Sequence, residues 1–261
     1  MPEIPDRKAS SLGQDEILRL HGAIVDVLTR TPTAHRRTAK DLMLRAAKKE
    51  PGGLYVSVTE HYDLAVIQDW GELERTVRQC RRCGLRDGCS GVVFGDGQET
   101  ARLVVCGEGP GADEDRLGRP FVGRAGQLLD KILEAGGFDR NRNAYILNVV
   151  KCRPPGNRIP TEEEREACRP NLEAQMRLIR PAIVLLLGAT ALQAVVDPAG
   201  RITRDRGRWV QKDGVWYMPT YHPAALLRNP NLKRDTWEDM KQVVRKYREL
   251  VDPDHACPHP V

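Results

Sequence analysis

The chain has 261 residues, of which 40% are hydrophobic and 30% charged, and its formal net charge is +5. It contains no run of about 18 apolar residues and no apolar stretch of the signal-peptide kind near its start, so we expect a cytoplasmic protein without a membrane span. Seven cysteines are an odd number for a disulfide framework, and clustered cysteines in a reducing compartment more often bind metals.

Residues 1–70 are predicted to form a helical N-terminal extension. Apolar residues recur at helical intervals from Ile17 to Leu28. A second, basic stretch from Ala39 to Lys49 is followed by Pro51-Gly52-Gly53, which is a strong break. No chemical motif is recognisable in this region, so the extension could bind another protein, grip DNA or only add packing.

Residues 71–252 are predicted to form one α/β domain. Short apolar runs suit strands that are buried on both faces of a parallel sheet, and they lie at 103–106, 145–150, 183–187 and 216–221. Helices are expected between and around these runs, at about 69–80, 124–135, 162–179 and 236–250. The remaining residues, 253–261, are expected to be a disordered tail.

Ligands of open parallel sheets lie beyond the carboxyl ends of the strands, so the loops after the four runs are where a site is expected. The loop Gly107-Glu108-Gly109-Pro110-Gly111-Ala112 fits a loose dinucleotide-binding pattern, which raises a nucleotide-dependent oxidoreductase as one possible function. The acidic residues at 108 and 113–115 argue against it, because they put negative charge where a pyrophosphate would bind.

A CxxC pair and two cysteines far downstream could supply four thiolates to one metal site: Cys80, Cys83, Cys152 and Cys168. Spacing alone does not choose between zinc and an iron–sulfur cluster, and a local turn with two ordinary buried thiols is an alternative. Of the other cysteines, Cys106 is expected in the core and Cys257 in the tail. Cys89 could replace one of the four ligands, and that alternative stays open.

Three long motifs resemble, in order and at fitting intervals, those of the family 4 uracil-DNA glycosylases: GEGPGADEDRLGRPFVGRAGQLLDKIL, NVVKCRPPGNRIPTEEE and HPAALLRNP. The resemblance covers about residues 78–248. It implies a three-layer α/β/α fold with a central four-stranded parallel sheet and a pocket for one flipped base. It also implies a [4Fe–4S] cluster held by Cys80, Cys83, Cys152 and Cys168. The implied partner is uracil-containing DNA, single- or double-stranded, bound by a monomer.

The resemblance also assigns roles in cutting the bond between uracil and its sugar. Phe121 would stack on the base and Asn148 would read its Watson–Crick edge, with Gly107 in the same base-binding pocket. His222 would donate a hydrogen bond to the departing base, and Glu108 would orient a water or oppose positive charge on the sugar.

The third motif implies contact with DNA. Leu227 and Arg228 match the family's DNA-inserting segment, with the leucine as an apolar wedge and the arginine as a phosphate contact. The chain departs from the family pattern at Gly109, where alanine is frequent, and at Ala224, where serine is frequent. A serine hydroxyl that could position His222 is therefore absent.

These residues favour a monofunctional DNA-repair glycosylase that leaves an abasic site, because no lysine is marked as a Schiff-base nucleophile. A covalently trapping uracil-DNA binder is disfavoured, since the interval after the first motif reads RPFVGRAGQLL and lacks the basic, histidine-containing loop of the trapping proteins. A non-catalytic, cluster-bearing DNA-binding protein is the other alternative. The presence of Glu108, Asn148 and His222 argues against it.

Overall fold

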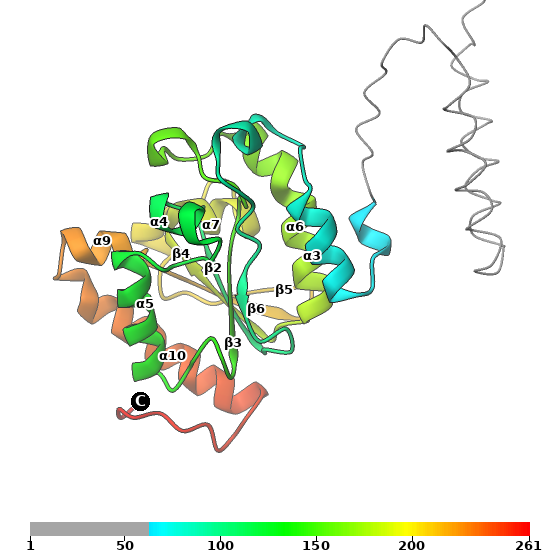
Figure 1. The fold of residues 1–261 in the computed structure, drawn as a ribbon. Helices are drawn as coiled ribbons and strands as arrows, with labels where there is room; N and C mark the ends of the chain where they lie inside the picture. Colours follow the sequence, from blue (N-terminus) through cyan, green and yellow to red (C-terminus); the bar gives the residue numbers. More distant parts are fainter. Residues whose placement is uncertain (1–62) are drawn as a thin grey trace, which may run out of the picture. The chain divides into compact units, whose positions relative to one another are not determined.

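The computed structural model describes residues 63–261, which form an α/β domain around one sheet (Figure 1). The helices expected at residues 17–28 and 39–49 lie outside the described residues. Within residues 63–261, no helix is long and apolar enough to cross a membrane.

The sheet has six strands in the order β1-β3-β2-β4-β6-β5. Its four inner strands run parallel, and they are β3 (Ala144–Asn148), β2 (Leu103–Gly107), β4 (Ile183–Leu187) and β6 (Val215–Thr220). The predicted four-stranded parallel core is confirmed. Two short antiparallel strands, β1 (Asp96–Gly97) and β5 (Val210–Lys212), border it. They were not predicted, because a strand of two or three residues is too short to show an alternation of apolar and polar residues.

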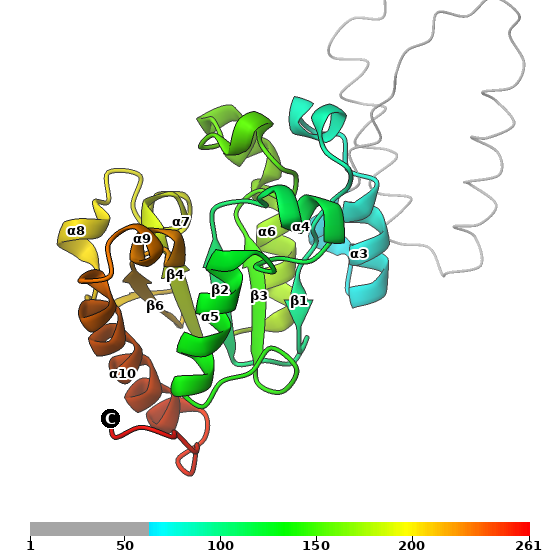
Figure 2. The same ribbon diagram turned by 60° about the vertical axis from the view of Figure 1, so that its left-hand side comes forward.

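Helices cover both faces of the sheet, as Figure 2 shows. On one face, the helices α3 (Trp70–Arg78), α6 (Glu162–Ile179) and α7 (Gly188–Val195) share a hydrophobic cluster with Val104 and Cys106 of β2. On the other, α5 (Arg124–Ala135) and α10 (Leu232–Leu250) share a second cluster with Leu103 and Val105. Neighbouring residues of one strand therefore enter different cores, which explains the continuous apolar runs.

Short helices fill the loops, and they are η1 (Leu64–Val66), η2 (Gly84–Gly88), α4 (Ala112–Leu117), η3 (Pro155–Asn157), α8 (Ile202–Asp205) and α9 (Pro223–Arg228). Three of them, α4, η3 and α9, follow β2, β3 and β6 along the chain. They therefore lie at the ends of the parallel strands where ligands are expected, which we call the carboxyl edge.

The domain begins earlier than the expected boundary at residue 71. Leu64 and Ile67 are buried in the first core, and Arg177 Nη2 of α6 donates hydrogen bonds to their carbonyl oxygens, at 3.0 and 2.6 Å. These residues are part of the α/β domain and not of the extension. The prediction missed them because the only element there, η1, has three residues and is too short to show a helical period.

The expected disorder of residues 253–261 is also wrong at several positions. His255 is buried, its ring stacks on Phe138 at 4.5 Å, and a ring nitrogen is hydrogen-bonded to Gly136 O at 2.9 Å. Cys257 Sγ bonds to Ala135 O at 3.3 Å. The tail can lie this close because residue 137 is a glycine. A Cβ at this position would come within 1.9 Å of the Ala256 carbonyl oxygen. Such backbone contacts leave no pattern in the sequence.

Candidate active site at the carboxyl edge of the sheet

A cleft of about 290 Å³ opens at the carboxyl edge, and four of the predicted site residues line it: Glu108, Phe121, Asn148 and His222. They come from the loops after β2 and β6, from the loop before α5, and from the last position of β3. The structure therefore brings together residues that lie up to 114 positions apart in the chain. Glu114, Asn157 and Ala224 also line the cleft.

Phe121 and Asn148 line the cleft, and Gly107 lies directly beneath their side chains. A Cβ on Gly107 would come within 2.5 Å of both Asn148 Oδ1 and Phe121 Cζ, so only glycine fits beneath the two side chains. Asn148 is 2% exposed, and its Oδ1 has no hydrogen-bond partner among residues 63–261. A buried acceptor without a donor costs about 1–3 kcal/mol. A ligand with an N–H group at this position would satisfy it.

Two loops of the cleft are tied together by Glu114, which sequence reasoning did not place in the site. Its Oε1 accepts hydrogen bonds from the backbone N–H groups of Val122 and Gly123, both at 2.9 Å. Its Oε2 accepts the N–H of Gly111 at 3.1 Å. The carboxylate thus fixes the glycine loop against the loop that carries Phe121.

The rings of His222 and Phe121 both line the cleft and lie next to each other, with centroids 5.6 Å apart and planes tilted by 33°. The Ala224 N–H donates to His222 Nδ1 at 3.1 Å, which leaves the ring hydrogen of the neutral form on Nε2. Burial, with a further contribution from the charge of Arg228, lowers the pKa of His222 to about 4. The imidazole is therefore neutral near pH 7 and can donate from Nε2. A backbone group holds the ring, so the missing serine hydroxyl at position 224 is not needed for its orientation.

Glu108 is held by a residue that sequence reasoning missed. The hydroxyl of Thr190, in the first turn of α7, donates a hydrogen bond to Glu108 Oε2. The same turn starts with Gly188, where a Cβ would lie 3.1 Å from the Cβ of His222. This turn therefore touches both residues that the sequence marked as catalytic. The only sequence signal was its position directly after a buried strand.

The four predicted cysteine ligands line one small cavity between the η2 loop, the end of β3 and helix α6. Asn171 Nδ2 lies 3.5 Å from Cys168 Sγ and 3.7 Å from Cys80 Sγ, so an amide donor faces two of the sulfurs. Among residues 63–261, no three His, Cys, Asp or Glu side chains are arranged to hold a single metal ion. Thiolates around a cluster bind different iron atoms and need not meet at one point, so this donor set fits an iron–sulfur cluster.

Cys89, the alternative ligand, lies beside this cavity without lining it. A side-chain hydrogen bond joins it to Cys152, and burial, followed by the nearby Cys89, raises the pKa of the Cys152 thiol. Its own Sγ donates to backbone oxygens, with Gly91 O at 3.4 Å. The geometry supports the original set of four, with Cys89 as a neighbour.

Helix α9 presents the predicted DNA-contacting residues. Leu226 is 1% exposed and packs inside, whereas Leu227 is 45% exposed. Arg228 is exposed, and its charge is close enough to lower the pKa of His222. The leucine that can act as a wedge is therefore Leu227, beside the cleft.

Comparison with known proteins connects this geometry to a family. The family model of the uracil DNA glycosylase superfamily matches residues 94–241, which include every cleft residue named above. The type-4 uracil-DNA glycosylase of Thermotoga maritima is 46% identical over 172 residues, covering 64% of this chain and 88% of the relative. That of Sulfurisphaera tokodaii is 40% identical over 189 residues, covering 69% and 84%. The type-5 enzyme of Thermus thermophilus is 34% identical over 178 residues, covering 61% and 80%.

Proposed function

The chain belongs to the type-4 uracil-DNA glycosylases, enzymes of DNA repair that hydrolyse an N-glycosyl bond, and from this premise we propose that it is monofunctional and works through the cleft at the carboxyl edge. The observation that carries the proposal is the buried Asn148 Oδ1, an acceptor without a partner among residues 63–261, next to the Phe121 ring. A uracil ring supplies the missing N–H group.

Uracil enters the cleft by leaving the base stack of the DNA. Phe121 stacks on its ring, Asn148 Oδ1 accepts its N3–H, and Asn148 Nδ2 donates to its O4. Cytosine has an acceptor at N3 and a donor at N4. The Asn148 Oδ1 acceptor would therefore face another acceptor, and the Nδ2 donor would face another donor. Selection for uracil follows from this reversal. The exposed Leu227 fills the gap that the flipped base leaves, and Arg228 contacts a phosphate.

Cleavage breaks the bond between C1′ of the sugar and N1 of uracil, and the electron pair leaves with the base. His222 keeps its proton and donates a hydrogen bond from Nε2 to uracil O2, where negative charge develops. The sugar becomes electron-poor, and Glu108 opposes its positive charge and orients the attacking water, which bonds to C1′ and gives up a proton to that carboxylate. Thr190 fixes one carboxylate oxygen of Glu108, so the carboxylate is oriented before the reaction begins.

The reaction ends at the abasic site, because no lysine is among the cleft-lining residues within the described part of the chain. Lys151 is the buried lysine next to the site, and its Nζ donates to the Asn148 carbonyl oxygen at 2.7 Å. Held in this way, it is not directed at the sugar. The proposal therefore contains no Schiff-base step and no lyase activity.

The test is an assay on single-stranded and duplex DNA that carries one uracil. We expect release of free uracil, and strand breaks that appear only after alkali treatment. Matched oligonucleotides with cytosine or thymine at the same position should stay intact. Breaks without alkali would show a lyase step and contradict monofunctionality. A stable protein–DNA adduct would support the covalently trapping alternative, and intact DNA with bound protein would support the non-catalytic one.

We also propose that Cys80, Cys83, Cys152 and Cys168 hold a [4Fe–4S] cluster, as the fit of the four-cysteine cavity supports. Bound there, the cluster would supply a covalent cross-link between the η2 loop, the end of β3 and α6. The amide of Asn171 would donate to two of its thiolate ligands.

Replacing Cys168 by serine is expected to remove most of the iron, the sulfide and the visible iron–sulfur absorbance. Because metal binding contributes directly to folding free energy, the melting temperature should fall by roughly 10 °C or more. Cys106→Ser is the matched control, since this buried thiol lies in strand β2 outside the cavity. It should keep its iron content. Full iron content in Cys168→Ser would contradict the assignment, and an equal loss from Cys89→Ser would favour Cys89 as a ligand.

A further inference from the structure

Phe121 has a backbone conformation that aromatic residues rarely adopt. Its φ is 53°, in the left-handed region, which costs an L-residue about 1–2 kcal/mol. Helix α5 packs directly against it, because a Cβ on Gly126 would lie 2.0 Å from the Phe121 carbonyl carbon and oxygen. Such a conformation persists only where the surroundings hold it. The contacts around Phe121 should therefore include groups whose function is to hold it.

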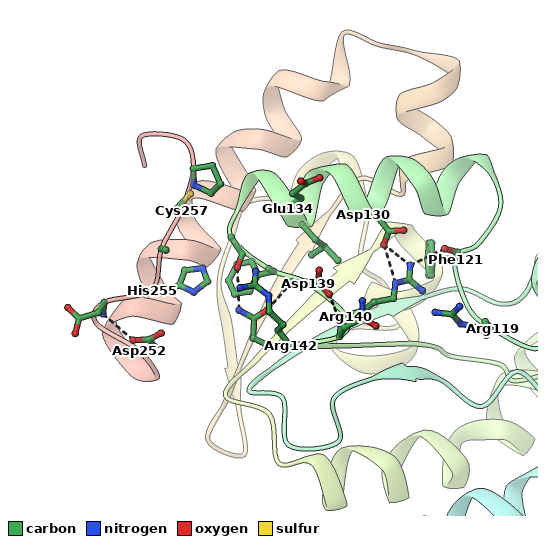
Figure 3. A pocket seen from close by; sticks show the side chains of 18 of the residues that line it. Arg119, Phe121, Asp130, Glu134, Asp139, Arg140, Arg142, Asp252, His255 and Cys257 are labelled. Atoms are coloured by element: carbon green, nitrogen blue, oxygen red, sulfur yellow. Dashed lines mark hydrogen bonds and ion pairs between the residues drawn. The ribbon is translucent and has the colours of Figure 1, made fainter.

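Arg140, in the loop before β3, supplies such contacts, and it does not line the cleft (Figure 3). Its side chain is buried, Nη1 donates to Pro120 O at 3.0 Å and Nη2 donates to Phe121 O at 3.0 Å. One guanidinium thus binds two consecutive carbonyl oxygens of the strained segment. Glu114 binds the next two N–H groups, of Val122 and Gly123, from the cleft side.

The guanidinium is itself fixed by two carboxylates. Asp130 of α5 pairs with Nη2 at 2.6 Å, and Asp96 of β1 pairs with Nη1 at 2.9 Å. Arg119 pairs with the same Asp96 at 2.9 Å, but its side chain is exposed and its hydrogen bond goes to this carboxylate and not to a carbonyl of the Phe121 segment. The planar fork of Arg140 matches both its carboxylate and carbonyl partners, which a lysine could not do.

Support is needed here because the Phe121 segment borders a second cavity, distinct from the cleft. This cavity measures about 1160 Å³ and is lined by Phe121, Asp130, Arg140 and His255, among others (Figure 3). Neither His222 nor Glu108 lines it, so despite its size it is not where the chemistry takes place. Without Arg140, the Pro120 and Phe121 carbonyls would turn toward water in this cavity and the strained φ could relax.

We propose that Arg140 is a positioning residue of the glycosylase reaction, which holds the left-handed conformation of Phe121 and through it the plane of the ring on which uracil stacks. This inference rests on the proposed role of Phe121 in base stacking. A misplacement of about 1 Å at a reacting group can cost roughly 100-fold in rate. Loss of Arg140 should therefore impair catalysis beyond any loss of stability.

The test is a double-mutant cycle of Arg140→Met and Phe121→Ala, with kcat and KM measured on single-stranded uracil DNA well below each variant's melting temperature. We expect Arg140→Met to lower kcat/KM by roughly 10- to 100-fold and to weaken inhibition by free uracil. In the Phe121→Ala background, Arg140→Met should lower kcat/KM by less than a further threefold, because the ring that Arg140 positions is gone. Arg119→Met, the matched control, should change kcat/KM by less than about twofold.

Equal effects of Arg140→Met with and without the Phe121 ring would overturn the inference, because Arg140 would then act through the fold as a whole. A Phe121→Ala variant with unchanged kcat/KM would instead overturn the proposed role of Phe121, so the two failures are distinguishable. If Arg140→Met does not fold, Asp130→Asn replaces it in the cycle. Asp130 is exposed and only orients the guanidinium, and Glu134→Gln, an exposed carboxylate on the same helix, is its control.

Discussion

Replacing His222 by alanine is expected to lower kcat on uracil-containing DNA by about 10²- to 10³-fold, the usual effect of removing one donor aimed at developing negative charge. The Ala224 N–H occupies Nδ1 at 3.1 Å, so Nε2 is the donor that faces the cleft. Since this bond strengthens as the base departs, the loss should appear in kcat and leave KM within about tenfold. Single-turnover release of uracil at saturating enzyme measures it directly.

His222→Gln keeps a donor of similar reach and should recover part of the lost rate. A His222→Ala variant with wild-type kcat would remove His222 from the mechanism. So would a variant whose entire defect disappears at saturating substrate, because the interaction would then belong to binding alone.

The pH dependence of stability follows from the same residue. Burial lowers the pKa of His222 from its ordinary 6.5 to about 4 in the folded protein. Between these values the unfolded chain binds a proton that the folded chain does not, so the stability that His222 contributes is complete above pH 6.5 and is lost as the pH falls toward 4. His222→Gln should flatten this part of the stability profile, and the wild-type kcat should show no histidine titration near pH 6.5.

The sequence predicted the parts of this fold that are continuous along the chain. The apolar run at 183–187 and the capped helix at 162–179 have the bounds that were expected, because burial on both faces and a capping box are local signals. Helix α10 begins at Leu232 and not near Thr236, whose hydroxyl donates back to Leu232 O at 3.0 Å inside the helix. The helix therefore starts about one turn earlier than was expected.

For the site, sequence motifs led to residues whose chemistry is visible in their type, such as His222 and Asn148. They did not lead to Thr190 or Arg140, which act through a neighbour. A threonine after a strand and an arginine in a loop are common. Thr190 gains a role only through its hydrogen bond to Glu108, and Arg140 only through its bonds to the carbonyl oxygens of Pro120 and Phe121. Those contacts span 82, 20 and 19 positions, so they depend on the completed fold.

The second large effect is expected at Asn148. In Asn148→Asp, the Nδ2 donor becomes a carboxylate oxygen, which faces the O4 acceptor of uracil, so kcat/KM for uracil should fall by about 10³-fold or more. The same carboxylate can accept the N4 amino group of cytosine, and slow excision of cytosine should appear where the wild type has none. Matched oligonucleotides with uracil or cytosine at one position measure both.

Asn157→Ala is the control for this substitution, because Asn157 lines the same cleft but its Oδ1 already accepts a bond from Arg153 Nε at 2.7 Å. It should change kcat/KM for uracil by less than about tenfold and leave cytosine uncut. The unpaired Oδ1 distinguishes Asn148 from Asn157 in this cleft, and a base that supplies an N–H group there would offset the cost of burying that acceptor. Equal losses in the Asn148 and Asn157 variants would mean that the cleft reads the base by shape, with no part for that oxygen.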